Sequence, residues 1–142
     1  MKISPTFCIL PWIHMFLAPG GEVLPCCIGD WRKPLGNWRK DKLQWIWNNA
    51  AYRELRRRMI SGMENENCRA CQRDEATGGR SFRQNMNSIF KTELKTILNS
   101  EGASSVDFSW KYMDVRFSNL CNFKCRTCNR QYSSQWAEED RR

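Results

Sequence analysis

The stretch "FCILPWIHMFLAPGGEVLPCC", residues 7–27, decides the fold of the first half of this chain. Apolar residues on both sides of "APGG" indicate two short extended segments, and Pro19, Gly20 and Gly21 supply the turn between them. The returning strand is "EVLPCC". We therefore predict a β-hairpin that carries three of the eight cysteines of the chain, Cys8, Cys26 and Cys27. His14, the only histidine, is expected to be packed or hydrogen-bonded near this hairpin.

Two helical patterns follow the hairpin. Apolar residues recur at steps of three or four from Leu43 to Met59, which predicts an amphipathic helix with Gly62 as its stop. The apolar positions are Leu43, Ile46, Trp47, Ala51, Leu55 and Met59, and the arginines 53, 56, 57 and 58 lie largely off them on a solvated face. Residues 64–79 form a cysteine-bearing loop or short helix. Ser81 then caps a second helix that runs to about residue 98.

The last part of the chain reads as the beginning of a βα unit. After a linker at 99–105, "WKYMDVRFS" at 110–118 predicts a strand that runs into a loop with three cysteines. "SSQWAEED" then begins a helix with Ser133 or Ser134 as its N-cap. Because one strand cannot form a sheet alone, we expect the sequence to be an N-terminal piece of a longer protein.

Composition and charge narrow the functional classes. The formal net charge is +8, from 23 Lys and Arg against 15 Asp and Glu, which suits a polyanionic partner but does not determine the fold. No stretch approaches the ~20 apolar residues that span a bilayer. The apolar N-terminus is interrupted by Pro11 and His14 and runs into motif residues rather than a cleavage site. We expect a cytoplasmic protein without a membrane partner, in which clustered cysteines bind metal or do redox chemistry.

Cys121, Cys125 and Cys128 are three potential ligands within eight residues, "CNFKCRTC". A short loop of this kind can wrap one small cluster. A [4Fe–4S] cluster normally takes four cysteines, so three protein ligands would leave one iron open to a substrate or cofactor. Zinc sites prefer CxxC pairs, and the wider CxxxC step therefore favours the cluster.

The same loop resembles the CxxxCxxC signature of the radical S-adenosylmethionine (radical SAM) enzymes. The resemblance implies that Cys121, Cys125 and Cys128 hold a [4Fe–4S] cluster whose fourth iron chelates S-adenosylmethionine, on the loop after the first strand of a partial (β/α) barrel. Reductive cleavage would give a 5′-deoxyadenosyl radical that abstracts a substrate hydrogen. The family usually has an aromatic residue before the last cysteine, where this chain has Thr127. Thr127 and Asn122 are the cofactor contacts that the resemblance implies.

A second pattern involves the remaining cysteines. Cys8, Gly21 and Cys26 match the C-x(9–15)-G-x(4)-C opening of the SPASM and twitch auxiliary-cluster domains, and Cys68-x-x-Cys71 supplies a closing pair. This resemblance implies an auxiliary [4Fe–4S] cluster held by Cys8, Cys26, Cys68 and Cys71, with Cys27 as the alternative to Cys26. Most such domains follow the barrel, whereas this pattern precedes it.

Together these patterns predict an α+β chain in two parts. Residues 1–100 would form a twitch/SPASM-like β-hairpin with helices, and residues 106–142 the start of a truncated radical SAM core. The expected cofactors are two [4Fe–4S] clusters and S-adenosylmethionine. The expected partners are a small-molecule, peptide or sugar substrate and a reductant such as flavodoxin or ferredoxin. The alternative is a basic Cys₄ zinc-binding module that contacts nucleic acid, with salt-dependent binding.

Overall fold

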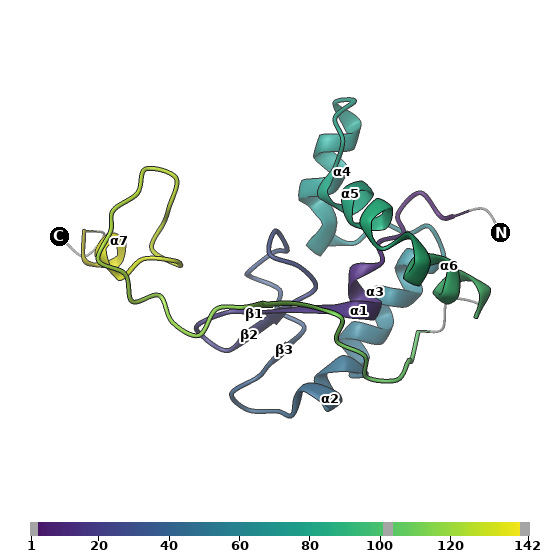
Figure 1. Ribbon diagram of the computed structural model, residues 1–142, viewed down its shortest axis with the longest axis horizontal. Coiled ribbons are helices and arrows are strands. Elements are labelled where there is room, and N and C mark those ends of the chain that lie inside the picture. Colours follow the sequence, from purple (N-terminus) through teal and green to yellow (C-terminus); the bar gives the residue numbers. More distant parts are fainter. Residues whose placement is uncertain (1–2, 101–103, 140–142) are drawn as a thin grey trace.

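A four-stranded sheet with the order β3-β2-β1-β4 lies at the centre of the computed structural model, which describes residues 3–100 and 104–139 (Figure 1). The strands are β1 (His14–Leu17), β2 (Glu22–Leu24), β3 (Gly36–Asn37) and β4 (Tyr112–Val115). The helices are α1 (Leu10–Ile13), α2 (Leu43–Trp47), α3 (Ala50–Ile60), α4 (Arg69–Ala76), α5 (Phe82–Ile89), α6 (Lys91–Asn99) and α7 (Ser134–Glu139), with a 3₁₀ turn, η1 (Glu66–Cys68). Helices α1 to α6 gather around one end of the sheet, so the fold is mixed α and β.

The predicted hairpin is present, but it is shorter than expected. Strands β1 and β2 pair antiparallel with Phe16 opposite Leu24. Gly21 has φ 104°, a conformation that side-chain-bearing residues rarely adopt, which explains the glycine in this turn. The first extended segment begins only at His14. The residues before it form the helical turn α1, because Pro11 lies in its first turn, where a proline ring stabilises rather than breaks a helix.

The predicted helix from Leu43 is interrupted at Asn48–Asn49. The Asn49 side chain accepts a hydrogen bond of 2.9 Å from the backbone N–H of Tyr52 and so begins α3 as a new helix. The interruption changes which side of α3 faces the core. Tyr52 is buried and Ala51 is exposed, and the prediction of Ala51 on the apolar stripe is therefore wrong.

The second predicted helix is also divided, into α5 and α6, at Phe90. Its predicted start is confirmed. Ser81 and Gln84 form a reciprocal capping box, in which each side chain bonds the other residue's backbone N–H. The predicted stop of α3 is confirmed as well, because Gly62 has φ 73° just beyond the helix.

Arg56 is fully buried, which contradicts the prediction of a solvated face for this arginine. Its guanidinium donates hydrogen bonds to the carbonyl of Pro11 (2.9 Å), the side-chain oxygen of Asn48 (2.9 Å) and the carbonyl of Ser104 (3.1 Å). It also lies 5.0 Å from the ring centroid of Trp47, with Tyr52 and Trp12 slightly farther away. Burial lowers its pKa to about 10. Two backbone carbonyls, the Asn48 side chain and the aromatic faces therefore replace part of the water that this cation loses, and its Nη2 has no hydrogen-bond partner among the described residues.

Strand β4 pairs in parallel with β1, with Tyr112 opposite His14 and Val115 opposite Leu17. The preceding residues are fastened to the helices. Asn48 exchanges hydrogen bonds with both backbone groups of Val106, and the Trp47 indole donates to the carbonyl of Asp107. The strand that the sequence assigns to a second part of the chain thus lies in the same sheet as the hairpin.

His14 is buried, and its Nδ1 donates to the carbonyl of Tyr112 at 2.9 Å while its ring stacks on that of Tyr112. Burial lowers its pKa. The prediction of a packed, hydrogen-bonded histidine is confirmed.

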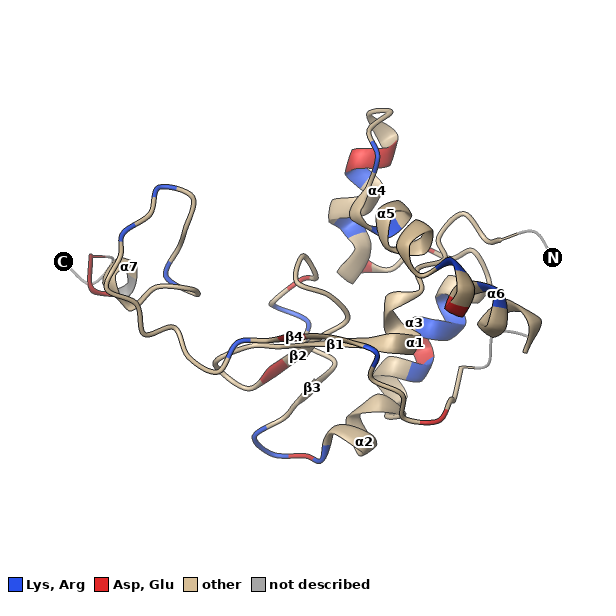
Figure 2. Ribbon diagram, in the orientation of Figure 1, with Lys and Arg blue, Asp and Glu red and all other residues tan. Residues whose placement is uncertain are grey.

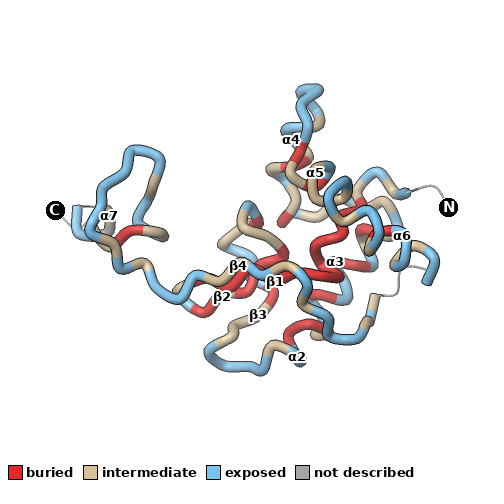
Figure 3. The backbone as a smooth tube through the Cα atoms, in the orientation of Figure 1, coloured by how far each residue is buried: buried red, intermediate tan, exposed pale blue. Residues whose placement is uncertain are grey.

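The buried residues, red in Figure 3, concentrate in α1, α3, β1 and β2, whereas the chain from about residue 116 to α7 extends away from this body and is mostly exposed. In the ribbon of Figure 2, basic residues (blue) and acidic residues (red) occur together along α3, α4 and α6. Within residues 3–100 and 104–139, none of the helices is both long enough and apolar enough to cross a membrane.

Candidate metal centre

Four of the five N-terminal cysteines, Cys8, Cys26, Cys68 and Cys71, line one pocket. About 380 Å³ between the lining residues is free of protein atoms, part of it open to solvent, although only about 20 Å³ accepts the centre of a water molecule. The rest of the wall is mostly apolar, with Leu10, Pro11, Pro25, Ile28, Met59, Ala70 and Phe82. The pocket is therefore narrow and rich in sulfur.

Three segments of the chain bring these thiols together, and the last of them carries both Cys68 and Cys71. Cys8 lies just before α1, and Cys26 lies in the turn after β2, where its carbonyl accepts from the backbone N–H of Gly29. Cys68 ends η1, and Cys71 lies in the first turn of α4. Residues three apart share one face of a helix, so the CxxC spacing directs Cys68 and Cys71 to the same pocket.

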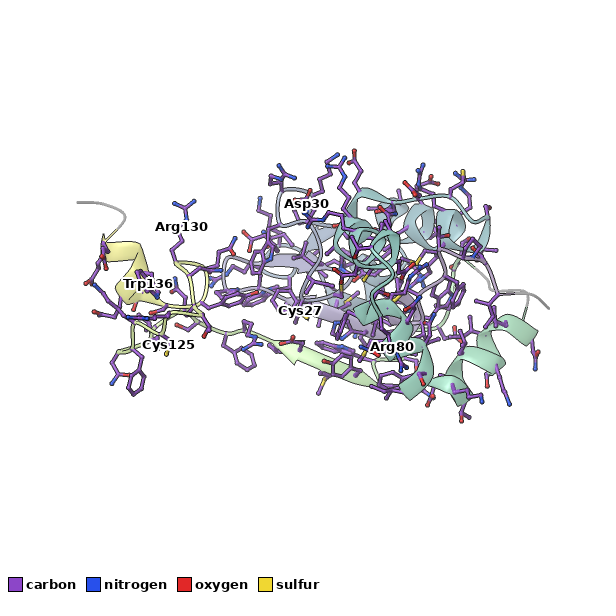
Figure 4. The ribbon with its side chains drawn as sticks, turned by 90° about the horizontal axis from the view of Figure 1, so that it is seen from above. Cys27, Asp30, Arg80, Cys125, Arg130 and Trp136 are labelled. Carbon is purple, nitrogen blue, oxygen red and sulfur yellow. The ribbon has the colours of Figure 1, made fainter. Side chains whose placement is uncertain are left out.

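Cys27 lies outside this pocket. It packs against a small second core of Phe16, Ala18 and Leu24, together with Trp31 and Tyr132. Burial and the nearby Asp114 carboxylate raise the pKa of the Cys27 thiol. Figure 4 shows Cys27 within the body of the molecule, on the side from which the C-terminal segment departs.

Burial dominates the electrostatics of the four-cysteine pocket. It raises the pKa of Cys8 and of Cys68 to about 12 each, and the neighbouring cysteines of the pocket add to the shift. The pKa of Cys26 is raised well above its usual value for the same reason. Backbone N–H groups act in the opposite direction by favouring the thiolates, Leu10 at Cys8 and Ile28 at Cys26. Binding of cationic iron to these sulfurs would therefore release protons.

Four thiols in the wall of one pocket match the number of cysteines that a [4Fe–4S] cluster normally takes. A tetrahedral zinc requires four sulfurs at about 2.3 Å from one point. A [4Fe–4S] cluster is instead bound through separate irons, each by its own cysteine. All eight cysteines have free thiols, so none of them is prevented by a disulfide from binding a metal.

The loop with Cys121, Cys125 and Cys128 forms a second group, in the projecting C-terminal segment. Cys125 and Cys128 share one turn, in which the backbone N–H of Cys128 donates to the carbonyl of Cys125 at 2.9 Å. Cys125 is exposed and the other two are half-buried. Asn122 and Thr127, the implied cofactor contacts, are both exposed on this loop.

Helix α7 holds the loop in shape. The Ser134 hydroxyl bonds both backbone groups of Cys121, and the Trp136 indole donates to the carbonyl of Cys125 at 3.2 Å. Figure 4 shows Cys125 and Trp136 side by side in this segment. The helix begins at Ser134. Ser133, the residue before it, uses its hydroxyl to bond the carbonyl of Phe123 at 2.8 Å, so both predicted cap candidates also fasten the cysteine loop.

Tyr132 connects this loop to the body. Its ring meets Trp31 edge to face at 5.7 Å, and the Arg116 guanidinium lies 5.7 Å from the ring centroid. Trp31 in turn contacts Phe16 of β1 at 5.4 Å. A chain of aromatic contacts therefore connects Phe16 in the sheet, through Trp31, to Tyr132, shortly after the cysteine loop.

We expect Tyr132→Ala to release the loop from the body, because the mutation removes the ring that packs on Trp31. Limited trypsin digestion should then cut after Arg126 and Arg130 several-fold faster than in the wild type. Gln131→Ala, an exposed neighbour, is the matched control and should leave the cleavage rate unchanged. Equal rates in Tyr132→Ala and the wild type would show that this contact does not hold the loop.

Sequence reasoning missed two polar residues on α5 that support the four-cysteine pocket. The Asn87 side chain accepts from the backbone N–H of Ile9 (2.8 Å) and donates to the carbonyl of Phe7 (2.9 Å), so it fixes the backbone on both sides of Cys8. Arg83 lines the pocket itself. Arg83 follows Phe82 and Asn87 follows Met86 in the sequence. A polar residue beside each of these apolar positions was the sequence feature that could have indicated a role for the pair.

Comparison with known proteins agrees with this site. Residues 8–72 match the family model of SPASM, an iron-sulfur cluster-binding domain. The matched range includes all four cysteines of the pocket, and it ends one residue after Cys71. The match indicates iron–sulfur cluster binding in this part of the chain and supports the resemblance to the twitch and SPASM domains. No curated protein and no solved structure matches the chain.

Proposed function

We propose that this chain is an iron–sulfur protein of the radical SAM type, in which residues 8–72 hold an auxiliary [4Fe–4S] cluster. The observation that carries the proposal is the convergence of Cys8, Cys26, Cys68 and Cys71 on one narrow, mostly apolar pocket. Four thiolates would close the coordination of such a cluster, which suits a structural or electron-relay role rather than substrate binding. Cys26 is the proposed ligand in place of Cys27, since Cys27 lies outside the pocket.

Cys121, Cys125 and Cys128 are the proposed ligands of a second [4Fe–4S] cluster, which would supply one-electron reductive cleavage of S-adenosylmethionine and hydrogen abstraction from a substrate. The protein's own contribution at this site is positioning. Ser134 and Trp136 fix the loop backbone at two of the three cysteines, and the exposure of Asn122 and Thr127 leaves them accessible to a ligand. The substrate would be a small molecule, peptide or sugar, and the electron donor a flavodoxin or ferredoxin.

The surroundings of β4 fit the further proposal that it is the first strand of a (β/α) barrel. In the sheet of the described residues β4 is an edge strand. Large apolar side chains lie exposed on it and after it, Met113, Phe117, Leu120 and Phe123. An edge strand followed by exposed apolar residues is what the rim of a barrel core would present before further strands pack on it.

Metal analysis of protein prepared anaerobically tests the proposal. We expect brown protein with about eight irons and eight acid-labile sulfides per chain if both sites hold [4Fe–4S] clusters. Addition of S-adenosylmethionine should change the EPR spectrum of the reduced protein, because one cluster has an open iron. Protein that is free of iron and loaded with zinc would overturn the proposal in favour of a zinc-binding module.

A further inference from the structure

Arg83 places a cation at the four-cysteine pocket. It lies in the first turn of α5, it is 7% exposed, and it lines the pocket together with all four thiols. A buried cation in the wall of the pocket acts on any negative charge inside it, because solvent screens the interaction little.

The position of Arg83 is fixed by several partners. Its guanidinium pairs with the Glu75 carboxylate through two nitrogens, with Nε 3.1 Å from Oε1, and it also donates to the carbonyl of Pro5. The Ser81 hydroxyl donates to the same carboxylate. Glu75 lies on α4, the helix that carries Cys71, and its partner Arg83 lines the pocket. Two charges of opposite sign are therefore held at fixed places beside one group of sulfurs.

We propose that the Arg83–Glu75 pair sets the reduction potential of the cluster held by Cys8, Cys26, Cys68 and Cys71. The inference rests on the proposed function of that pocket. Reduction adds one electron to the cluster, and a nearby positive charge stabilises the reduced form while a negative charge destabilises it. The intact pair is close to neutral in total, so that removal of either partner exposes the charge of the other.

The test is a redox titration, followed by EPR, of variants that each change one of these charges. Arg83→Gln should lower the midpoint potential and Glu75→Gln should raise it. Each shift should correspond to about a tenfold change in the reduction equilibrium, which is 59 mV for a one-electron couple. Arg83→Lys keeps the charge and should stay close to the wild type. To isolate the signal, every variant also carries Cys125→Ala, which removes a ligand of the other proposed site.

Arg80→Gln is the matched control. It removes the same charge three residues away, from an exposed side chain that does not line the pocket, and Figure 4 shows it next to α4 and α5. Its potential should equal that of the wild type. Potentials that do not move in opposite directions in Arg83→Gln and Glu75→Gln would overturn the inference while the cluster remains. Absence of any cluster from the parent protein would instead overturn the proposed function.

Discussion

Replacement of Cys71 by alanine is expected to remove one of the two proposed clusters and so to halve the iron content, from the expected eight or so atoms per chain to about four. Cys71 is buried in the wall of the pocket, and its three partner thiols come from other turns of the chain. A [4Fe–4S] cluster without its fourth thiolate loses one iron–sulfur bond and becomes open to solvent at that iron. Iron and sulfide analysis of anaerobically prepared protein measures the effect directly.

Cys27→Ala is the matched control for this prediction, because the chain offers a cysteine adjacent to Cys26 that packs elsewhere. It should keep the full iron content. If Cys27→Ala lost half of the iron and Cys26→Ala did not, the ligand assignment would be reversed. Loss of all iron in Cys71→Ala would show that the two sites do not assemble independently.

Replacement of Arg56 by alanine is expected to lower the free energy of unfolding by about 3 kcal/mol or more, which is large for a single substitution. The mutation leaves the buried carbonyl of Pro11 and the half-buried carbonyl of Ser104 without the donor that they share, and a buried acceptor without a partner costs about 1–3 kcal/mol. It also removes the cation from between the rings of Trp47, Tyr52 and Trp12. Urea denaturation followed by tryptophan fluorescence is the appropriate measurement.

Arg57→Ala provides the comparison, on the same helix and with the same change in charge. Arg57 is half-exposed and pairs with Glu54 on its own helix, so the substitution should change stability by less than about 0.5 kcal/mol. Equal effects at the two positions would contradict a structural role for Arg56. Arg56→Ala should also weaken the attachment of the segment before β4, because Arg56 donates a hydrogen bond to the carbonyl of Ser104 in that segment.

Local signals in the sequence were sufficient for the hairpin turn, the Ser81 cap and the Gly62 stop, because each depends on a few neighbouring residues. Cysteine spacing was sufficient to group Cys8, Cys26, Cys68 and Cys71, since their order along the chain carries the pattern. The helix interruptions at Asn49 and Phe90 were not predicted, because an apolar repeat continues across both of them. For the interruption at Asn49, the only local indication was the asparagine itself, a residue that favours the N-cap position of a helix.

Long-range contacts could not be predicted in this way. Arg56 belongs to a run of arginines, and nothing in its neighbours distinguishes the one whose partners are Pro11 and Ser104. The pairing of β4 with β1 joins residues about a hundred positions apart, and a strand pattern does not name its partner. Arg83 became a functional candidate only once α5 was seen to pack on the cysteine pocket.

The parallel pairing of β1 and β4 affects the distance between the two groups of cysteines. If the two groups were joined only through the chain that connects them, their separation would be a broad distribution governed by the length of that chain. Because β4 is hydrogen-bonded to the strand that follows Cys8 and α1, the sheet acts instead as a spacer of fixed length. The separation of the two groups of sulfurs then depends on the strand register, which fixes where the cysteine loop leaves the sheet, and on the contact of Tyr132 with Trp31, which holds that loop to the body.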